Sequence, residues 1–193
     1  MKLKCSLPAV SCLLAIWVIS GCNCNSSEEN KLWPVLPYLH SEAAAADSTL
    51  ANIRKIITRN DGGFDTVFIH RNEFRNEAKD FLTLPDISSS KFAGDYKEEE
   101  IMDESINRFV IRQTALKPEK QLIQSQEVLI KPALEGDQVM TVMIHTLQNR
   151  GDSSVQKRMI WTIGKEFQVT TLSQKGREPE KIYTYKITWA DQE

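Results

Sequence analysis

The chain has 193 residues, of which 41% are hydrophobic and 26% are charged. This balance is typical of a globular protein, and the length allows one domain with a hydrophobic core. The formal net charge of −2 at pH 7 argues against nucleic acid as a partner and gives no general attraction to anionic lipid.

The first 20 residues have the features of a secretion signal. Lys2 and Lys4 form a basic start, and an almost uncharged apolar run follows over residues 7–20. The run is too short to cross the hydrocarbon core of a bilayer, which takes about 20 apolar residues. A basic start, a short apolar core and an exit made of small residues predict a secretory signal.

The exit from this run, Ile19-Ser20-Gly21-Cys22, resembles the lipobox of bacterial lipoproteins. The resemblance implies that residues 1–21 are a signal peptide, that the thiol of Cys22 is diacylated, and that the new amino terminus receives a further acyl chain such as palmitate. Two or more chains give a durable anchor, at about 0.8 kcal/mol per buried CH₂. The alternatives are a secreted soluble protein cleaved nearby and an uncleaved membrane anchor.

Cleavage before Cys22 would change both the cysteine count and the charge. Loss of Lys2 and Lys4 lowers the basic residues from 24 to 22 against 26 acidic ones, a formal charge of −4. Cys24, which we interpret as a bystander, would then be the one cysteine besides the lipidated Cys22. A disulfide framework or a cysteine-based metal site is therefore excluded from the rest of the chain.

Residues 22–31 are small, polar and unpatterned, and they predict a flexible tether that leads into a single α+β domain over residues 32–193. Ser26-Ser27-Glu28-Glu29 resembles the acidic surface-export signals of Bacteroidota lipoproteins, although a solvated tether is the interpretation that the composition favours. The expected location is the bacterial cell envelope, attached to the outer membrane through the lipid on Cys22. The domain would face the periplasm or the cell exterior, with an envelope protein as a candidate partner.

The domain is expected to begin with a strap and a helix. Two prolines in residues 32–38 disfavour a regular helix there and predict an extended strap. Ser41 or Asp47 would cap a helix that ends near Thr58. Its apolar face, at spacings of three and four, would consist of Leu50, Ile53 and Ile57.

A strand over residues 64–69 and a second helix are predicted next. Asn72 or Asn76 would cap this helix and Pro85 would end it. Its apolar side would consist of Phe74, Ala78, Phe81 and Leu82. We interpret residues 86–104 as a connection anchored by Phe92 and Tyr96. Within it, Glu98-Glu99-Glu100 is interpreted as a solvated face, because three consecutive carboxylates cannot all point at one centre.

The remainder of the chain is rich in β-branched and aromatic residues separated by turn residues. The predicted strands cover residues 106–116, 122–131, 138–147, 155–163, 167–173 and 181–189. Because no helix separates them, neighbouring strands should pair antiparallel. Alternation in the later strands predicts one apolar and one polar face. The expected fold is a curved antiparallel meander of about six to seven strands, with the two N-terminal helices packed on one face.

Chemical motifs are sparse. The sequence contains no phosphate-binding glycine loop, nucleophile elbow or zinc-protease motif, so no cofactor or metal is predicted. The three histidines, His40, His70 and His145, lack metal-ligand spacing. The sequence favours a non-catalytic protein, and a hydrolase with a distributed site that includes His70 and Glu73 stays open as an alternative.

The apolar sheet face also predicts where a ligand would bind. The candidate ligand-facing residues are Trp161, Tyr183, Tyr185 and Trp189, with a plain core as the alternative role. A curved sheet capped by helices can enclose a cavity, and this architecture is similar to that of LolB-type lipoproteins, although no motif matches that family. The chain resembles the small lipoproteins of the Bacteroidota, which implies a location and no activity. The predicted function is a lipid-anchored, non-catalytic accessory or binding component. The alternative is a carrier of an apolar ligand or a lipoprotein.

Overall fold

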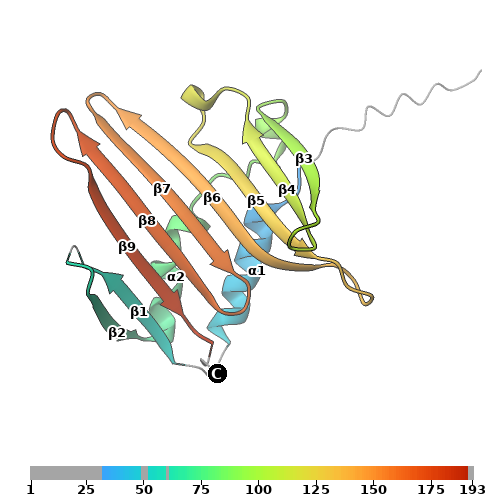
Figure 1. Ribbon diagram of the computed structural model, residues 1–193, viewed down its shortest axis with the longest axis horizontal. Helices are drawn as coiled ribbons and strands as arrows, with labels where there is room; N and C mark the ends of the chain where they lie inside the picture. Colours follow the sequence, from blue (N-terminus) through green and yellow to red (C-terminus); the bar gives the residue numbers. More distant parts are fainter. Residues whose placement is uncertain (1–31, 49–51, 60, 191–193) are drawn as a thin grey trace, which may run out of the picture.

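A single antiparallel sheet of nine strands dominates the fold (Figure 1). The computed structural model describes residues 32–48, 52–59 and 61–190. The strand order is β2-β1-β9-β8-β7-β6-β5-β4-β3, so seven strands that follow one another in the chain form a meander and the first hairpin joins its end beside β9. The antiparallel α+β architecture is as predicted, but the expectation of about six to seven strands was too low.

The meander accounts for all six strands predicted in the second half of the chain. Its strands are β3 (Tyr96–Asp103), β4 (Arg108–Ala115), β5 (Ile123–Lys131), β6 (Gln138–Arg150), β7 (Ser153–Thr162), β8 (Glu166–Lys175) and β9 (Lys181–Thr188). The turn between β7 and β8 depends on Gly164, whose positive φ of 69° is a conformation that glycine adopts without steric cost.

Strand β3 was not predicted, and it lies inside the segment interpreted as a connection. The sequence did not predict this strand because it contains a run of acidic residues, which are unusual in strands. As the edge strand of the sheet it is largely exposed, so most of these charges remain in water. Tyr96 is buried and Phe92 packs against the core, which confirms both predicted anchors.

The first predicted helix was wrong in both of its boundaries. Helix α1 spans Val35–Asp47, and the segment to Thr58 forms strand β1 (Ile53–Thr58), with Leu50 outside the described residues. The extended strap is therefore limited to residues 32–34. Pro34 precedes α1 and Pro37 lies in its first turn, where the backbone N–H groups lack intrahelical partners, so neither proline prevents the helix.

Strand β2 (Phe64–Ile69) is as predicted, and it pairs with β1 throughout. The second predicted helix is present as three short pieces, η1 (Arg71–Glu73), α2 (Phe74–Glu77) and α3 (Lys79–Leu82). Its predicted apolar side is correct, since Phe74, Ala78 and Phe81 are fully buried. Two further turns, η2 (Ser90–Phe92) and η3 (Pro118–Lys120), flank β3 and β4.

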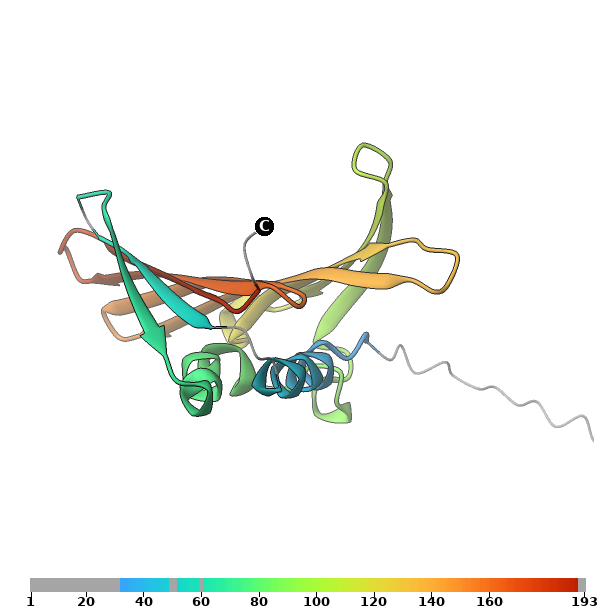
Figure 2. The ribbon, with the colours of Figure 1, turned by 90° about the horizontal axis from the view of Figure 1, so that it is seen from below.

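The helices lie together on one face of the sheet (Figure 2). Phe74 and Phe81 from the helices meet a cluster of aromatic residues on the central strands. Trp161 and Phe167, cross-strand partners on β7 and β8, stack with their ring centroids 5.1 Å apart. Trp189 lies 5.1 Å from Phe74, ring to ring. These edge-on and stacked contacts fix the layer between the helices and the sheet.

None of the described helices covers the opposite face of the sheet (Figure 2). Arg158, Thr184 and Lys186 lie on this face, in agreement with the predicted polar alternation. The face is nevertheless mixed, because Ile160 and Ile182 also lie on it with 39% and 58% of their surface exposed.

Candidate functional site

Three of the four candidate ligand-facing residues belong to the core. Trp161, Tyr185 and Trp189 are 0%, 8% and 4% exposed, whereas Tyr183 is 45% exposed. Burial raises the pKa of Tyr185 well above its usual value, and its hydroxyl donates to the carbonyl oxygen of Glu77 at 3.2 Å. None of the four lines any of the pockets described below, which involve only residues in the described part of the chain.

The region of His70 and Glu73 is a helix start. His70 is exposed, and its backbone N–H donates to Glu73 Oε2 at 3.1 Å. This contact satisfies a donor that would otherwise lack a partner at the first turn. Neither residue lines a pocket described here, and the described residues contain no cluster of three acidic, histidine or cysteine side chains that could hold a metal ion.

His145 lies on the open face of β6, beside Arg158 of β7 and in contact with the Gln156 amide. Burial, with a smaller contribution from the positive charge of Arg158, lowers the pKa of the imidazole. The fold therefore favours the neutral form of the His145 imidazole. Its neighbours are a cation and an amide, so this site lacks the carboxylate that usually orients a histidine base.

A pocket with a largely apolar lining lies beside β3, and we call it the loop pocket. Its volume is about 640 Å³, within the range of about 300–1,000 Å³ that is usual for small-molecule sites. Three separate segments of the chain supply its walls. The residues that line it are Leu32, 87–90, 92–94, Tyr96, Lys97 and Leu116.

A hydrogen-bonded loop around Asp86 builds one wall of the loop pocket. The Ser88 hydroxyl donates to Asp86 Oδ1 at 2.7 Å, and the Ser89 hydroxyl donates to the Asp86 carbonyl oxygen at 2.7 Å. Both hydroxyl hydrogens are therefore engaged within the loop, and the serine oxygens keep acceptor capacity only. The Phe92 ring packs edge-on against Tyr96 at 6.2 Å and closes the apolar side.

The floor of the loop pocket is fixed by Tyr96. Its hydroxyl donates to the carbonyl oxygen of Ile123 at 3.1 Å, and burial raises its pKa to about 12. The nearby ammonium group of Lys97 is paired with Glu99 Oε1 at 2.5 Å. The pocket thus presents a largely apolar lining, three serine hydroxyls and a cation that is paired with Glu99.

A polar bracket holds the N-terminal segment against the sheet next to this pocket. Glu98 Oε2 accepts hydrogen bonds from the backbone N–H of Trp33 and from Gln113 Nε2, each at 2.7 Å. Gln113, which is 1% exposed, also donates to the Trp33 carbonyl oxygen at 2.9 Å. The interpretation of Glu98 as part of a solvated face was therefore wrong, because strand alternation turns it inward toward the segment that precedes α1.

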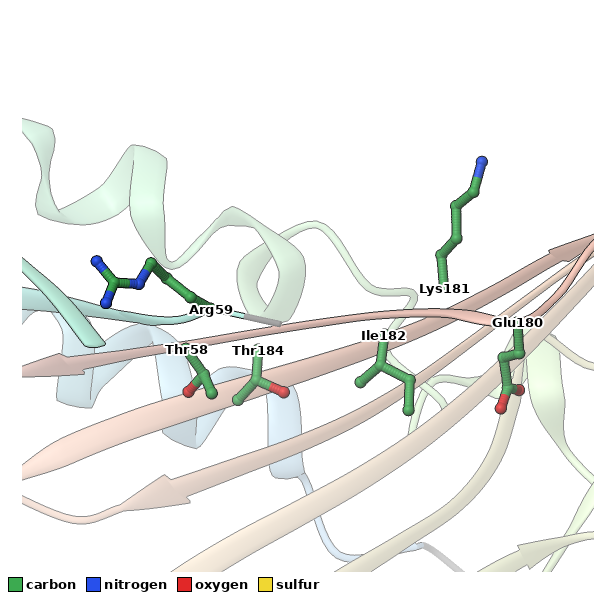
Figure 3. Close-up of a pocket in the computed structure, with 6 residues that line it drawn as sticks. All are labelled: Thr58, Arg59, Glu180, Lys181, Ile182 and Thr184. Atoms are coloured by element: carbon green, nitrogen blue, oxygen red, sulfur yellow. The ribbon is translucent and has the colours of Figure 1, made fainter. Parts of the chain in front are cut away.

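A second hollow lies where β9 meets β1, with a volume of about 500 Å³. Figure 3 shows Thr58, Thr184, Ile182 and Glu180 projecting to one side of the sheet and Lys181 to the other. The lining side chains come mainly from two adjacent strands, and Lys181 is paired with Glu178 at 3.5 Å. This arrangement is a shallow surface of threonines, charged side chains and the exposed Ile182.

Comparison with known proteins finds no matching family model, no matching curated protein and no matching solved structure. In the described part of the chain, no helix has both the length and the apolar character needed to cross a membrane. Cys22 and the lipobox lie outside the described residues. Sequence reasoning identified Phe92 and Tyr96 as anchors but missed the loop pocket, whose walls are far apart in the sequence.

Proposed function

We propose that the protein is a lipid-anchored, non-catalytic binding protein of the bacterial envelope, and that the loop pocket is its ligand site. The observation that carries this proposal is an apolar pocket of about 640 Å³ whose first lining residue, Leu32, follows Cys22 by ten residues. The lipobox supports the anchor, and the outer membrane is the proposed location.

The chemistry of the lining favours an acyl chain as the ligand. Leu32, Ile87 and Phe92 offer an apolar surface to a hydrocarbon chain, and Lys97 at the edge of the pocket is paired with Glu99. A ligand that enters this pocket gains by removing apolar surface from water, at about 25 cal/mol per Å². Its polar end would lie toward solvent beside the exposed Ser90, because the hydroxyls of Ser88 and Ser89 donate within their own loop.

The position of the pocket in the chain fits access to a membrane. Ten residues reach at most about 35 Å when fully extended. A lipid on Cys22 would therefore keep Leu32 within that distance of the bilayer surface. The high local concentration of lipid at this distance favours capture of an acyl chain even by a site of modest affinity.

The test uses membranes from cells that express the full chain, treated with a fatty acid that carries a photoactivatable diazirine in its acyl chain. We expect light-dependent adducts on peptides from residues 87–97. Leu116→Glu should reduce labelling at least fivefold, because Leu116 lines the pocket yet is 55% exposed, so the substitution spares the fold. Leu134→Glu is the matched control, since Leu134 is fully exposed outside the pocket.

Equal labelling of the two variants, or adducts spread over the whole chain, would reject the loop pocket as the ligand site. The anchor is tested separately by the intact mass of the membrane-extracted protein beside that of Cys22→Ser. Cleavage before Cys22 with added acyl chains, lost in the variant, is the expected result. An unlipidated product would contradict the anchor without bearing on the pocket.

A further inference from the structure

Strand β2 forms one edge of the sheet and carries an unusual amount of exposed apolar surface. Phe64, Val67 and Phe68 are 65%, 51% and 70% exposed. No described element lies beyond β2 in the sheet order, and it forms the outermost ribbon in Figure 1. Exposed apolar edge strands are sites where another strand can add.

The hydrogen-bond pattern of the hairpin shows which residues of β2 face outward. Arg59 N–H donates to the Gly63 carbonyl oxygen at 2.8 Å, in the same register that pairs Thr58 with Phe64. Hydrogen-bonded pairs alternate along an antiparallel ladder, so Asp65, Val67 and Ile69 turn their main-chain groups toward β1. The N–H and C=O groups of Phe64, Thr66 and Phe68 therefore point away from the sheet.

The outward-facing residues are self-complementary. If two copies of β2 pair antiparallel with Thr66 on a two-fold axis, Phe64 lies opposite the partner's Phe68, and each Thr66 lies opposite the other. Residues opposite one another share a face, so both phenylalanine pairs meet on the open face of the joined sheet. Six main-chain hydrogen bonds form, two at each of the three pairs.

The charges of the two sheet edges favour this pairing over pairing of β2 with β3. The single charged side chain of β2, Asp65, is already paired with Arg59 at 3.0 Å. The other edge, β3, carries Lys97, three consecutive glutamates and Asp103, and edge charges oppose strand addition. Pairing of β2 with β2 closes after two copies, whereas pairing of β2 with β3 would propagate without end.

We propose that the protein forms a symmetric dimer in which two β2 strands join two nine-stranded sheets into one. The decisive experiment is disulfide trapping of the full chain in membranes, with Thr66→Cys as the reporter. The two Thr66 Cα atoms would lie about 5.5 Å apart, within the range of about 4.4–6.8 Å that a disulfide spans. The parent chain gives the baseline from its native cysteines, and Ile101→Cys on β3 is the matched control, because Ile101 is 40% exposed on the opposite edge.

We expect Thr66→Cys to yield a disulfide-linked homodimer at least fivefold above both the parent chain and Ile101→Cys. Adding Phe68→Lys should remove at least four fifths of this product, because it removes the phenylalanine contact from both pairs and places a charge on the edge strand, where charges oppose strand addition. Three outcomes would overturn the dimer: equal trapping at positions 66 and 101, trapping that Phe68→Lys leaves unchanged, and a trapped product that contains a different protein. Equal trapping would indicate random collision in the membrane and not a specific contact of the β2 edges. The last outcome would indicate that a foreign strand occupies this edge.

Discussion

Substitution of Glu98 by alanine should destabilise the junction between the N-terminal segment and the sheet. The change removes the acceptor for two donors, the Trp33 N–H and Gln113 Nε2, each 2.7 Å away. Gln113 keeps its bond to the Trp33 carbonyl oxygen, whereas the Trp33 N–H loses its acceptor. The polar bracket therefore keeps one of its three hydrogen bonds, and the helical fold of α1 is left intact.

The magnitude follows from the two lost contacts. Hydrogen bonds to a charged group contribute about 1.5–3 kcal/mol each, and an unsatisfied buried donor costs about 1–3 kcal/mol. Glu98 is half-buried, so water can replace part of what is lost. We therefore expect the free energy of unfolding to fall by about 2–3 kcal/mol in total. For a domain of this size, that loss lowers the melting temperature by about 4–12 °C.

The assay is thermal and urea unfolding of the full chain purified in mild detergent, followed by tryptophan fluorescence. Glu100→Ala is the matched control, because Glu100 lies on the same strand and the same face but is exposed, and its loss should change stability by no more than about 0.5 kcal/mol. Equal stability of the two variants would refute the role of the bracket. Glu98→Ala should also weaken labelling of the loop pocket, since Leu32 is held beside Trp33.

Two further predictions concern the core and the pH dependence of stability. Trp161→Ala should lower the free energy of unfolding by about 3–5 kcal/mol in urea titrations, because this fully buried ring packs on Phe81 and Phe167. The control is Tyr183→Ala, which should lower it much less because Tyr183 is exposed. The lowered pKa of His145 means that the unfolded chain takes up a proton at a higher pH than the folded one does. The stability that His145 contributes is therefore fully present above the ordinary imidazole pKa of about 6.5 and declines as the pH falls below it. Urea titrations between pH 8 and 5 should show a shallower decline of the free energy of unfolding for His145→Gln than for the parent chain. Parallel pH profiles of the two proteins would contradict this prediction.

The meander could be predicted because every one of its later strands carries two consistent signals. Alternation of Tyr185 and Ile187 with Thr184 and Lys186 sets one face toward the core, and turn residues separate each strand from the next. Chain order then decides the pairing, since short connections join antiparallel neighbours. Local spacing of apolar residues also predicted the apolar side of the helix that carries Phe74 and Phe81.

The errors arose where the local pattern was ambiguous. Ile53 and Ile57, four residues apart, fit a helix face, yet the β-branched residues of this segment suit a strand, and pairing with β9 decides between them. The loop pocket and the Glu98 bracket could not be predicted, because each unites residues more than 60 positions apart, as with Trp33 and Glu98. Local periodicity contains no information about such contacts.

The loop pocket and the dimer edge lie at opposite ends of the sheet, so the two proposals can fail independently. β3 and β2 are the first and last strands of the sheet, with seven strands between them (Figure 1). Sites this far apart without shared partners behave additively. Phe68→Lys should therefore abolish trapping at position 66 and leave acyl-chain labelling unchanged, whereas Leu116→Glu should do the reverse. If one substitution removed both signals, the common cause would be loss of the fold, and a melting temperature lowered to match would identify it. If each substitution removes only its own signal, the dimer would carry two acyl-chain sites at its outer ends and two lipid anchors. The dimer would then bind the membrane more tightly than one chain, because the first anchor raises the effective concentration of the second.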